Sequence, residues 1–187
     1  MSARPAPRHV APACGPRMAI AQIPMHWELD DNLAAMRHAM HVAHDQGAAL
    51  CAFAELAVTG FHRRIAEGAL PERVGPAVAE LQALAARLGV AAAFGVPTFG
   101  ANGERFNSHL FVDAQGGLAG CVAKNGLTAP EATFFQAGSE RPVFPVCGLA
   151  GTAVICREIE DFEPVTRQLA GTGVRLILWP GQMRPDP

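Results

Sequence analysis

The sequence has no tyrosine and a single lysine, and only 17% of its 187 residues are charged. A nucleic-acid-binding surface needs clustered basic residues, and the formal net charge of −2 argues against one. The longest apolar stretch, around Leu88–Pro97, is interrupted by glycine and is too short to span a bilayer. Half of the residues are nevertheless hydrophobic, which excludes a disordered chain. We therefore expect a soluble globular protein with no nucleic-acid or membrane partner.

The five cysteines form no CxxC motif, since the closest pair, Cys147 and Cys156, is nine positions apart. The odd number of cysteines, the missing N-glycosylation sequon and the missing secretory segment predict reduced thiols in the cytoplasm. Residues 1–17 are rich in proline, alanine and arginine. We interpret them as a disordered leader, with a transit peptide as the alternative.

Three histidines, His38, His41 and His44, recur on the first predicted helix and could suggest a metal site. No HExxH motif accompanies them, so a surface or half-buried helix face is the simpler interpretation. No glycine-rich phosphate loop is present either. The sequence therefore predicts neither a metal nor a cofactor.

Apolar runs alternate with segments of helical spacing along the chain. The runs predict strands at 18–23, 49–53, 90–96, 106–113, 118–123, 142–146, 151–155 and 174–178. Helical spacing, N-caps and glycine stops predict helices over 30–46, 76–88 and 162–171. This alternation is typical of a layered α/β fold.

Three residues with reactive side chains stand at the ends of predicted strands. Cys156 lies between a strand and a helix, where ligands bind in open α/β sheets and where a helix N-terminus favours a thiolate. Glu55 interrupts the apolar segment 49–58, which suits a general base, although a glutamate turned to solvent is an alternative. Lys124 is the only lysine among 15 basic residues, and the alternative there is a chance surface lysine.

A thiol, a carboxylate and an ammonium group suffice for acyl transfer. The carboxylate takes the thiol proton, the thiolate attacks a carbonyl carbon, and the ammonium stabilises the oxyanion. No histidine is required.

Four segments resemble, in the same order, the nitrilase superfamily of carbon–nitrogen hydrolases, whose triad is Glu-Lys-Cys. The opening strand, first helix and glutamate-bearing strand correspond to the segment MAIAQIP…DDNLAAM…GAALCAFAELAVTGF. The lysine hairpin and the segment after it correspond to GERFNSHLFVDAQGGLAGCVAKNGL and TAPEATFFQAG. The nucleophile strand and the strand that follows correspond to GLAGTAVICREIEDFEPVTRQLAGTGVRLILWPG.

The resemblance implies an α-β-β-α sandwich, often assembled as a homodimer. Cys156 would be the nucleophile and Glu55 the general base. Lys124 and the backbone N–H of Arg157 would stabilise the oxyanion, and Glu131 would orient the lysine or the substrate. The expected reaction is hydrolysis of a small linear amide or carbamoyl compound through a cysteine thioester, releasing ammonia or an amine, with an amidase favoured over a nitrilase.

The resemblance also implies a domain that continues beyond the last residue given. We therefore expect residues 18–187 to form a carbon–nitrogen hydrolase domain that is incomplete at its C-terminus. An alternative function stays open, namely a catalytically inactive remnant that acts as a binding or scaffold protein.

Overall fold

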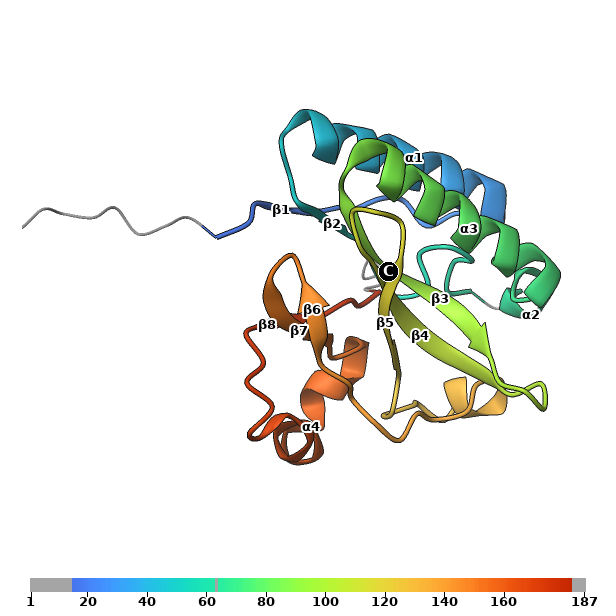
Figure 1. The fold of residues 1–187 in the computed structure, drawn as a ribbon. Helices are drawn as coiled ribbons and strands as arrows, with labels where there is room; N and C mark the ends of the chain where they lie inside the picture. Colours follow the sequence, from blue (N-terminus) through green and yellow to red (C-terminus); the bar gives the residue numbers. More distant parts are fainter. Residues whose placement is uncertain (1–14, 63, 183–187) are drawn as a thin grey trace, which may run out of the picture.

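A computed structural model describes residues 15–62 and 64–182, which form two facing β-sheets with helices on their outer sides (Figure 1). Of the predicted leader, residues 1–14 lie outside the described residues. None of the described helices is long and apolar enough to cross a membrane.

The larger sheet has five strands. In spatial order they are β1 (Met18–Ile20), β2 (Leu50–Ala52), β3 (Ala91–Phe99), β4 (Arg105–Val112) and β5 (Leu118–Ala123). Strands β1 to β3 are parallel, whereas β3, β4 and β5 form an antiparallel meander. Because β4 is antiparallel to both β3 and β5, strand β5 runs in the same direction as β2, and the C-terminal ends of β2 and β5 lie at the same edge of the sheet.

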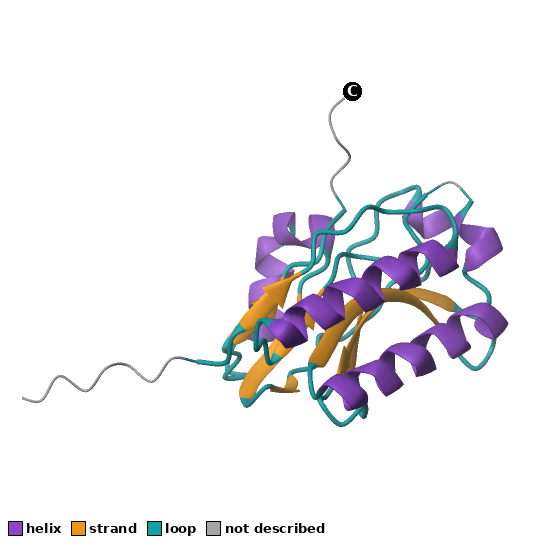
Figure 2. Ribbon diagram, turned by 90° about the horizontal axis from the view of Figure 1, so that it is seen from above, coloured by secondary structure: helices purple, strands orange, loops and turns teal. Residues whose placement is uncertain are grey.

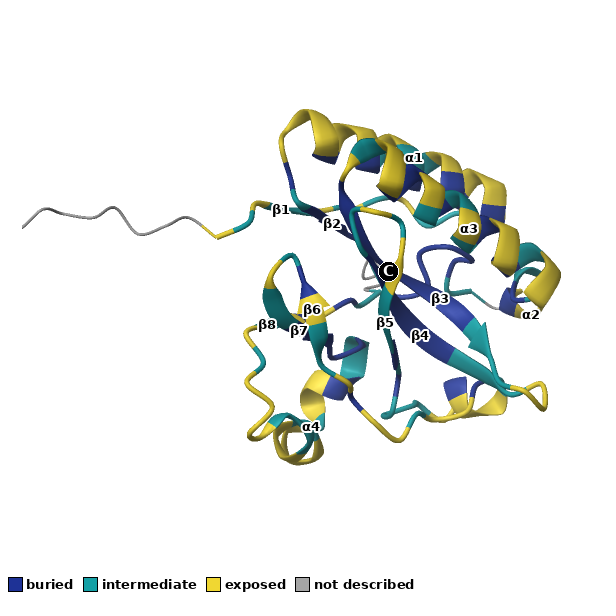
Figure 3. Cartoon of the chain, viewed as in Figure 1, coloured by how far each residue is buried: buried dark blue, intermediate teal, exposed yellow. Residues whose placement is uncertain are grey.

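Two long helices cover one face of this sheet. Helix α1 (Leu29–Asp45) and helix α3 (Pro71–Leu88) lie side by side over it, as the view from above shows (Figure 2). Their apolar sides pack on one face of β2, β3 and β4, and their outer sides are exposed (Figure 3). The predicted glycine stop at Gly89 is confirmed, because this residue ends α3 in the left-handed conformation at φ 64°.

The predicted start of the second helix at Pro76 is wrong. The helix begins at Pro71, where a proline needs no hydrogen-bond donor, and Pro76 lies inside it. The short helix α2 (Ile65–Gly68) was not predicted, since four residues are too few for a periodic pattern.

The smaller sheet packs against the other face of the larger one. Its strands are β6 (Phe144–Val146), β7 (Leu149–Ala153) and β8 (Leu176–Leu178), with β7 antiparallel to β6 and parallel to β8. Apolar side chains from both sheets, including Phe111 and Ile155, fill the space between them. Several strands are shorter than predicted; β1, for example, ends at Ile20 rather than at residue 23.

Two 3₁₀ helices and one α-helix complete the described fold. These are η1 (Glu131–Thr133), η2 (Cys156–Glu160) and α4 (Phe162–Leu169). Helix α4 lies on the side of the smaller sheet away from α1 and α3 (Figure 1). The layers therefore follow the order helix, sheet, sheet, helix, and the predicted α-β-β-α fold is confirmed.

Candidate active site

Glu55 is held in a tight loop immediately after β2. The loop crosses Gly95 of β3, where a Cβ atom would lie 2.0 Å from the backbone nitrogen of Leu56. Only glycine fits at this crossing, and Leu56 itself has a positive φ of 50°. The side chain of Glu55 is 1% exposed, so the alternative of a glutamate turned to solvent is wrong.

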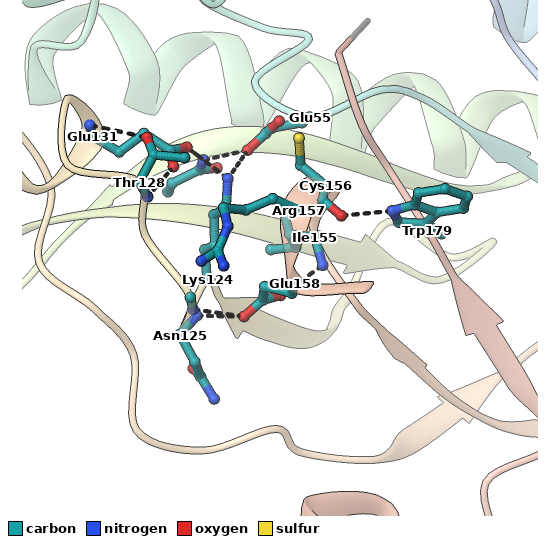
Figure 4. A network of polar contacts seen from close by, with 12 residues as sticks. Glu55, Lys124, Asn125, Thr128, Glu131, Ile155, Cys156, Arg157, Glu158 and Trp179 are labelled. Carbon is teal, nitrogen blue, oxygen red and sulfur yellow. Dashed lines mark hydrogen bonds and ion pairs between the residues drawn. The ribbon is translucent and has the colours of Figure 1, made fainter. Parts of the chain in front are cut away.

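Lys124 lies between two carboxylates. Its Nζ atom is 2.8 Å from Oε1 of Glu55 and 2.6 Å from Oε1 of Glu131. Asn107 on β4 donates to the same Glu55 oxygen at 2.7 Å, and its backbone oxygen accepts the N–H of Lys124 at 2.8 Å. Lys124 is 1% exposed, which excludes a surface lysine. These four side chains form one buried network, of which Figure 4 labels Glu55, Lys124 and Glu131.

Burial and charge act in opposite directions on this network. Burial lowers the pKa of Lys124, but the carboxylates of Glu55 and Glu131 outweigh this effect and raise the pKa above its usual value. Burial likewise raises the pKa of Glu131, but hydrogen bonds from Lys124 and from the backbone N–H of Thr128 bring it below its usual value. Lys124 and Glu131 therefore stay charged at neutral pH.

Cys156 approaches from the smaller sheet, where it begins η2. Its φ of 53° lies in the left-handed region, which costs energy for any residue other than glycine. The backbone after β8 holds it there, since the N–H of Cys156 donates to the oxygen of Pro180 at 2.8 Å. The indole N–H of Trp179 donates to the Cys156 oxygen at 2.7 Å (Figure 4).

The thiol of Cys156 points toward the carboxylate of Glu55 (Figure 4). Burial and the nearby charge of Glu55 raise the pKa of Cys156 above its usual value, and the opposing effect of Lys124 is smaller. The expectation that a helix N-terminus would favour a thiolate is therefore wrong, because η2 has only five residues, and burial and the carboxylate of Glu55 raise the pKa. Oxygen Oε2 of Glu55 has no hydrogen-bond partner among the described residues and can accept a proton.

Of the other two predicted site residues, Glu131 and Arg157, only Glu131 has its side chain in the network. Glu131, at the start of η1, belongs to the network around Lys124. The side chain of Arg157 instead pairs with Asp161, with Nη2 and Oδ1 3.1 Å apart. Only the backbone N–H of Arg157, next to Cys156 in the chain, is available for the predicted oxyanion role.

Sequence reasoning missed three residues that shape the site. Asn107 donates to Glu55 and to Glu131 and so bridges the two carboxylates. Its position on an apolar strand, two residues before His109, could have indicated a buried polar side chain. Glu158 and Arg141 form a buried ion pair beneath Cys156, with Nη2 and Oε1 2.9 Å apart. Glu158 and Arg141 are far apart along the chain, so no local sequence pattern could have indicated that they pair.

Unlike Cys156, the other described cysteines have no carboxylate among the causes of their pKa shifts. Burial raises the pKa of Cys51 to about 12 and also raises the pKa of Cys121 and Cys147. Cys14 lies outside the described residues. Within the described ranges no group of three potential metal ligands occurs.

Comparison with known proteins identifies the family of the chain. The family model of the carbon-nitrogen hydrolases matches residues 17–186. The chain therefore belongs to the carbon-nitrogen hydrolase family, and the predicted resemblance is confirmed. No curated protein sequence matches the chain.

Solved structures of a bacterial amidase share the fold. One is an amidase from Nesterenkonia sp., with a TM-score of 0.81 and 27% identity, covering 91% of this chain and 66% of that one. Another is a mutant of the amidase from Nesterenkonia sp. AN1, in which the acetamide moiety of fluoroacetamide is covalently added at the active-site cysteine. It matches with a TM-score of 0.82 and 26% identity, with 91% and 66% coverage. The present chain thus spans 66% of the length of these amidases.

Proposed function

We propose that this chain hydrolyses the carbon–nitrogen bond of a small linear amide or carbamoyl compound through a thioester on Cys156. The observation that carries the proposal is the position of Glu55. One of its oxygens accepts from Lys124, the other has no partner among the described residues, and the thiol points toward this carboxylate. The amidases with the same fold support an amide rather than a nitrile as the substrate.

In the first half of the reaction, Glu55 takes the thiol proton while the sulfur attacks the carbonyl carbon. The raised pKa of Cys156 suits this role, because a neutral thiol needs a base at the moment of attack. Lys124 and the backbone N–H of Arg157 stabilise the negative charge that develops on the carbonyl oxygen. Glu131 acts by holding the ammonium group of Lys124 in place.

Collapse of the tetrahedral intermediate breaks the carbon–nitrogen bond. Glu55 returns its proton to the leaving nitrogen, and ammonia or an amine departs. Glu55 then takes a proton from a water molecule that attacks the thioester, and the thiol of Cys156 regains that proton when the acid is released. The groups end in their starting protonation states.

Assembly and location are part of the same proposal. We propose a homodimer, supported by the large apolar side chains exposed around η2 and α4, such as Ile159 and Phe162. We propose a cytoplasmic location, supported by the free thiols of all four cysteines within the described ranges.

Ammonia release from a panel of small amides tests the proposal. We expect release that disappears in Cys156→Ala and an acyl adduct on Cys156 in intact-mass spectra. Release that survives in Cys156→Ala would refute the mechanism. If a correctly folded protein released no ammonia from any amide, the binding or scaffold alternative would replace it.

Glu55→Gln tests the base separately. We expect hydrolysis to fall by about 10²- to 10⁴-fold, the usual contribution of general base catalysis. The same change removes a negative charge next to the thiol, so it should lower the pKa of Cys156 and speed its alkylation by iodoacetamide at neutral pH. Glu67→Gln, an exposed glutamate, is the control. Slower alkylation in Glu55→Gln would contradict the assigned geometry.

A further inference from the structure

The carboxylate of Glu158 joins the two sheets directly beneath the candidate site. Its Oε1 atom accepts the backbone N–H groups of Asn125 at 2.6 Å and Gly126 at 3.0 Å, just after Lys124. Its Oε2 atom accepts the N–H of Ile155 at 2.6 Å, just before Cys156. One buried side chain therefore fixes the segment that follows Lys124 to the segment that precedes Cys156 (Figure 4).

Arg141 completes this connection from the loop before β6. Its two terminal nitrogens contact both oxygens of Glu158, at 2.9 Å from Nη2 to Oε1 and 3.3 Å from Nη1 to Oε2. Nη1 also donates to the backbone oxygen of Ala153 on β7, and Nε donates to Oε1 of Gln168 on α4 at 3.2 Å. A planar guanidinium can hold all these acceptors at once, which an ammonium group cannot.

The pair is buried and charged. Both side chains are 1% exposed. Burial raises the pKa of Glu158, but the hydrogen bond from Arg141 and those from the backbone outweigh it and hold the pKa below its usual value. Breaking such a pair leaves an uncompensated buried charge, so the connection is stiff as well as specific.

This stiffness matters because the reacting groups come from different sheets. Lys124 follows β5 of the larger sheet, whereas Cys156 follows β7 of the smaller one. Small sliding of one sheet over the other would change the separation of ammonium and thiol, and an error of about 1 Å can cost about 10²-fold in rate. We propose that Arg141 and Glu158 are positioning residues that set this separation, an inference that rests on the proposed function.

Arg141→Lys tests the proposal because it keeps the charge and loses the planar fork. We expect kcat to fall by about 10- to 100-fold with little change in KM, since both side chains are buried and closed to a substrate. Loosening the connection would move the thiol away from Glu55, which raises the pKa of Cys156, as well as from Lys124, which lowers it by less, so the pH profile of Cys156 alkylation should shift downward. Alkylation is mapped by mass spectrometry on the full chain without substrate.

Arg167→Lys is the matched control, because Arg167 pairs with Glu163 on the exposed side of α4. This control should leave kcat and the alkylation profile unchanged. Glu158→Gln is the second test variant, and it should reproduce both effects of Arg141→Lys. All variants are compared at a temperature at which circular dichroism shows them folded.

The outcomes separate positioning from mere stabilisation. Folded variants that lose stability but keep the wild-type kcat and alkylation profile would overturn the proposal. If the wild-type chain released no ammonia, the proposed function would fail. The alkylation profile would then decide the positioning role by itself, because an unshifted midpoint in both variants refutes it.

Discussion

The two sides of the candidate site are built in different ways. The side that carries the charges is closed: Glu55, Lys124 and Glu131 are at most 4% exposed, and the first two follow strands of a five-stranded sheet covered by two long helices. The side that carries the thiol is open, since Cys156 is half-buried and Trp179, which holds its backbone oxygen, is 61% exposed. Helix α4 on this side has no buried residue.

This difference follows from what each group does. Charges act most strongly where water is excluded, but they must be paired there, and the network around Lys124 meets both conditions. A nucleophile must be reached by its substrate, so it cannot be enclosed in the same way. The fold therefore places the network of Glu55, Lys124 and Glu131 on the better packed side and brings the thiol to it from the less packed sheet.

The largest expected effect concerns the closed side. Lys124→Met leaves two buried carboxylates without their cation, so the free energy of unfolding should fall by about 3–5 kcal/mol at pH 7. Cys156→Ala on the open side should cost about 1 kcal/mol, because only a half-buried sulfur is removed. Urea unfolding of the two variants measures the contrast, and equal losses would refute the distinction between the two sides.

A second variant tests whether charge causes the loss of stability in Lys124→Met. Adding Glu131→Gln to Lys124→Met removes one of the two unpaired carboxylates. The double variant should therefore be more stable than Lys124→Met alone. If the losses of stability in Lys124→Met and Glu131→Gln simply added in the double variant, packing rather than charge would explain the effect.

The next largest effect concerns a buried histidine that destabilises the closed side. His109 on β4 is 0% exposed, and neither ring nitrogen has a partner among the described residues. Burial lowers its pKa from 6.5 to about 3, so between these values the unfolded chain binds a proton that the folded chain does not. The free energy of unfolding should therefore have its full value above pH 6.5. Between pH 6.5 and about 3 it should fall by about 1.4 kcal/mol for each pH unit of acidification.

His109→Leu should remove this dependence. Urea unfolding between pH 6.5 and 5 measures it, because Glu131 and Glu158, whose pKa values are lowered, remain ionised in that window. The variant should also be about 1–3 kcal/mol more stable at pH 7, since an unpaired buried polar group is gone. The exposed His41 provides the control His41→Ala. An unchanged slope in His109→Leu would show that the imidazole is paired or hydrated in solution.

Much of the architecture could be predicted from local pattern. Glycines at helix ends, such as Gly89, and apolar runs between turns located most strands and the long helices. The start of α3 could not be chosen between Pro71 and Pro76, because either proline fits a first helical turn. The family resemblance provided the two-sheet arrangement, which periodicity alone does not contain.

Only part of the site could be predicted from the sequence, because some of its properties depend on distances in the folded chain. Glu55, Lys124 and Cys156 could be proposed because each interrupts or ends an apolar strand. The direction of the Cys156 pKa shift could not, because it depends on the distance of Glu55 from the thiol and on burial. The Arg141–Glu158 pair was hidden because its two members are 17 residues apart in the sequence and no local pattern links them.

The smallest expected effect concerns the open side alone. Trp179→Phe keeps an aromatic ring but loses the N–H that binds the backbone oxygen of Cys156. The free energy of unfolding should fall by about 0.5–1.5 kcal/mol, the net contribution of one hydrogen bond. Hydrogen exchange should increase in the peptide around Cys156 and not in the peptide around Glu55. The matched control is Trp27→Phe, since Trp27 stacks on His62 away from the thiol. Faster exchange around Glu55 as well would mean that the two sides open together as one cooperative unit, and the contrast between a closed and an open side would be lost.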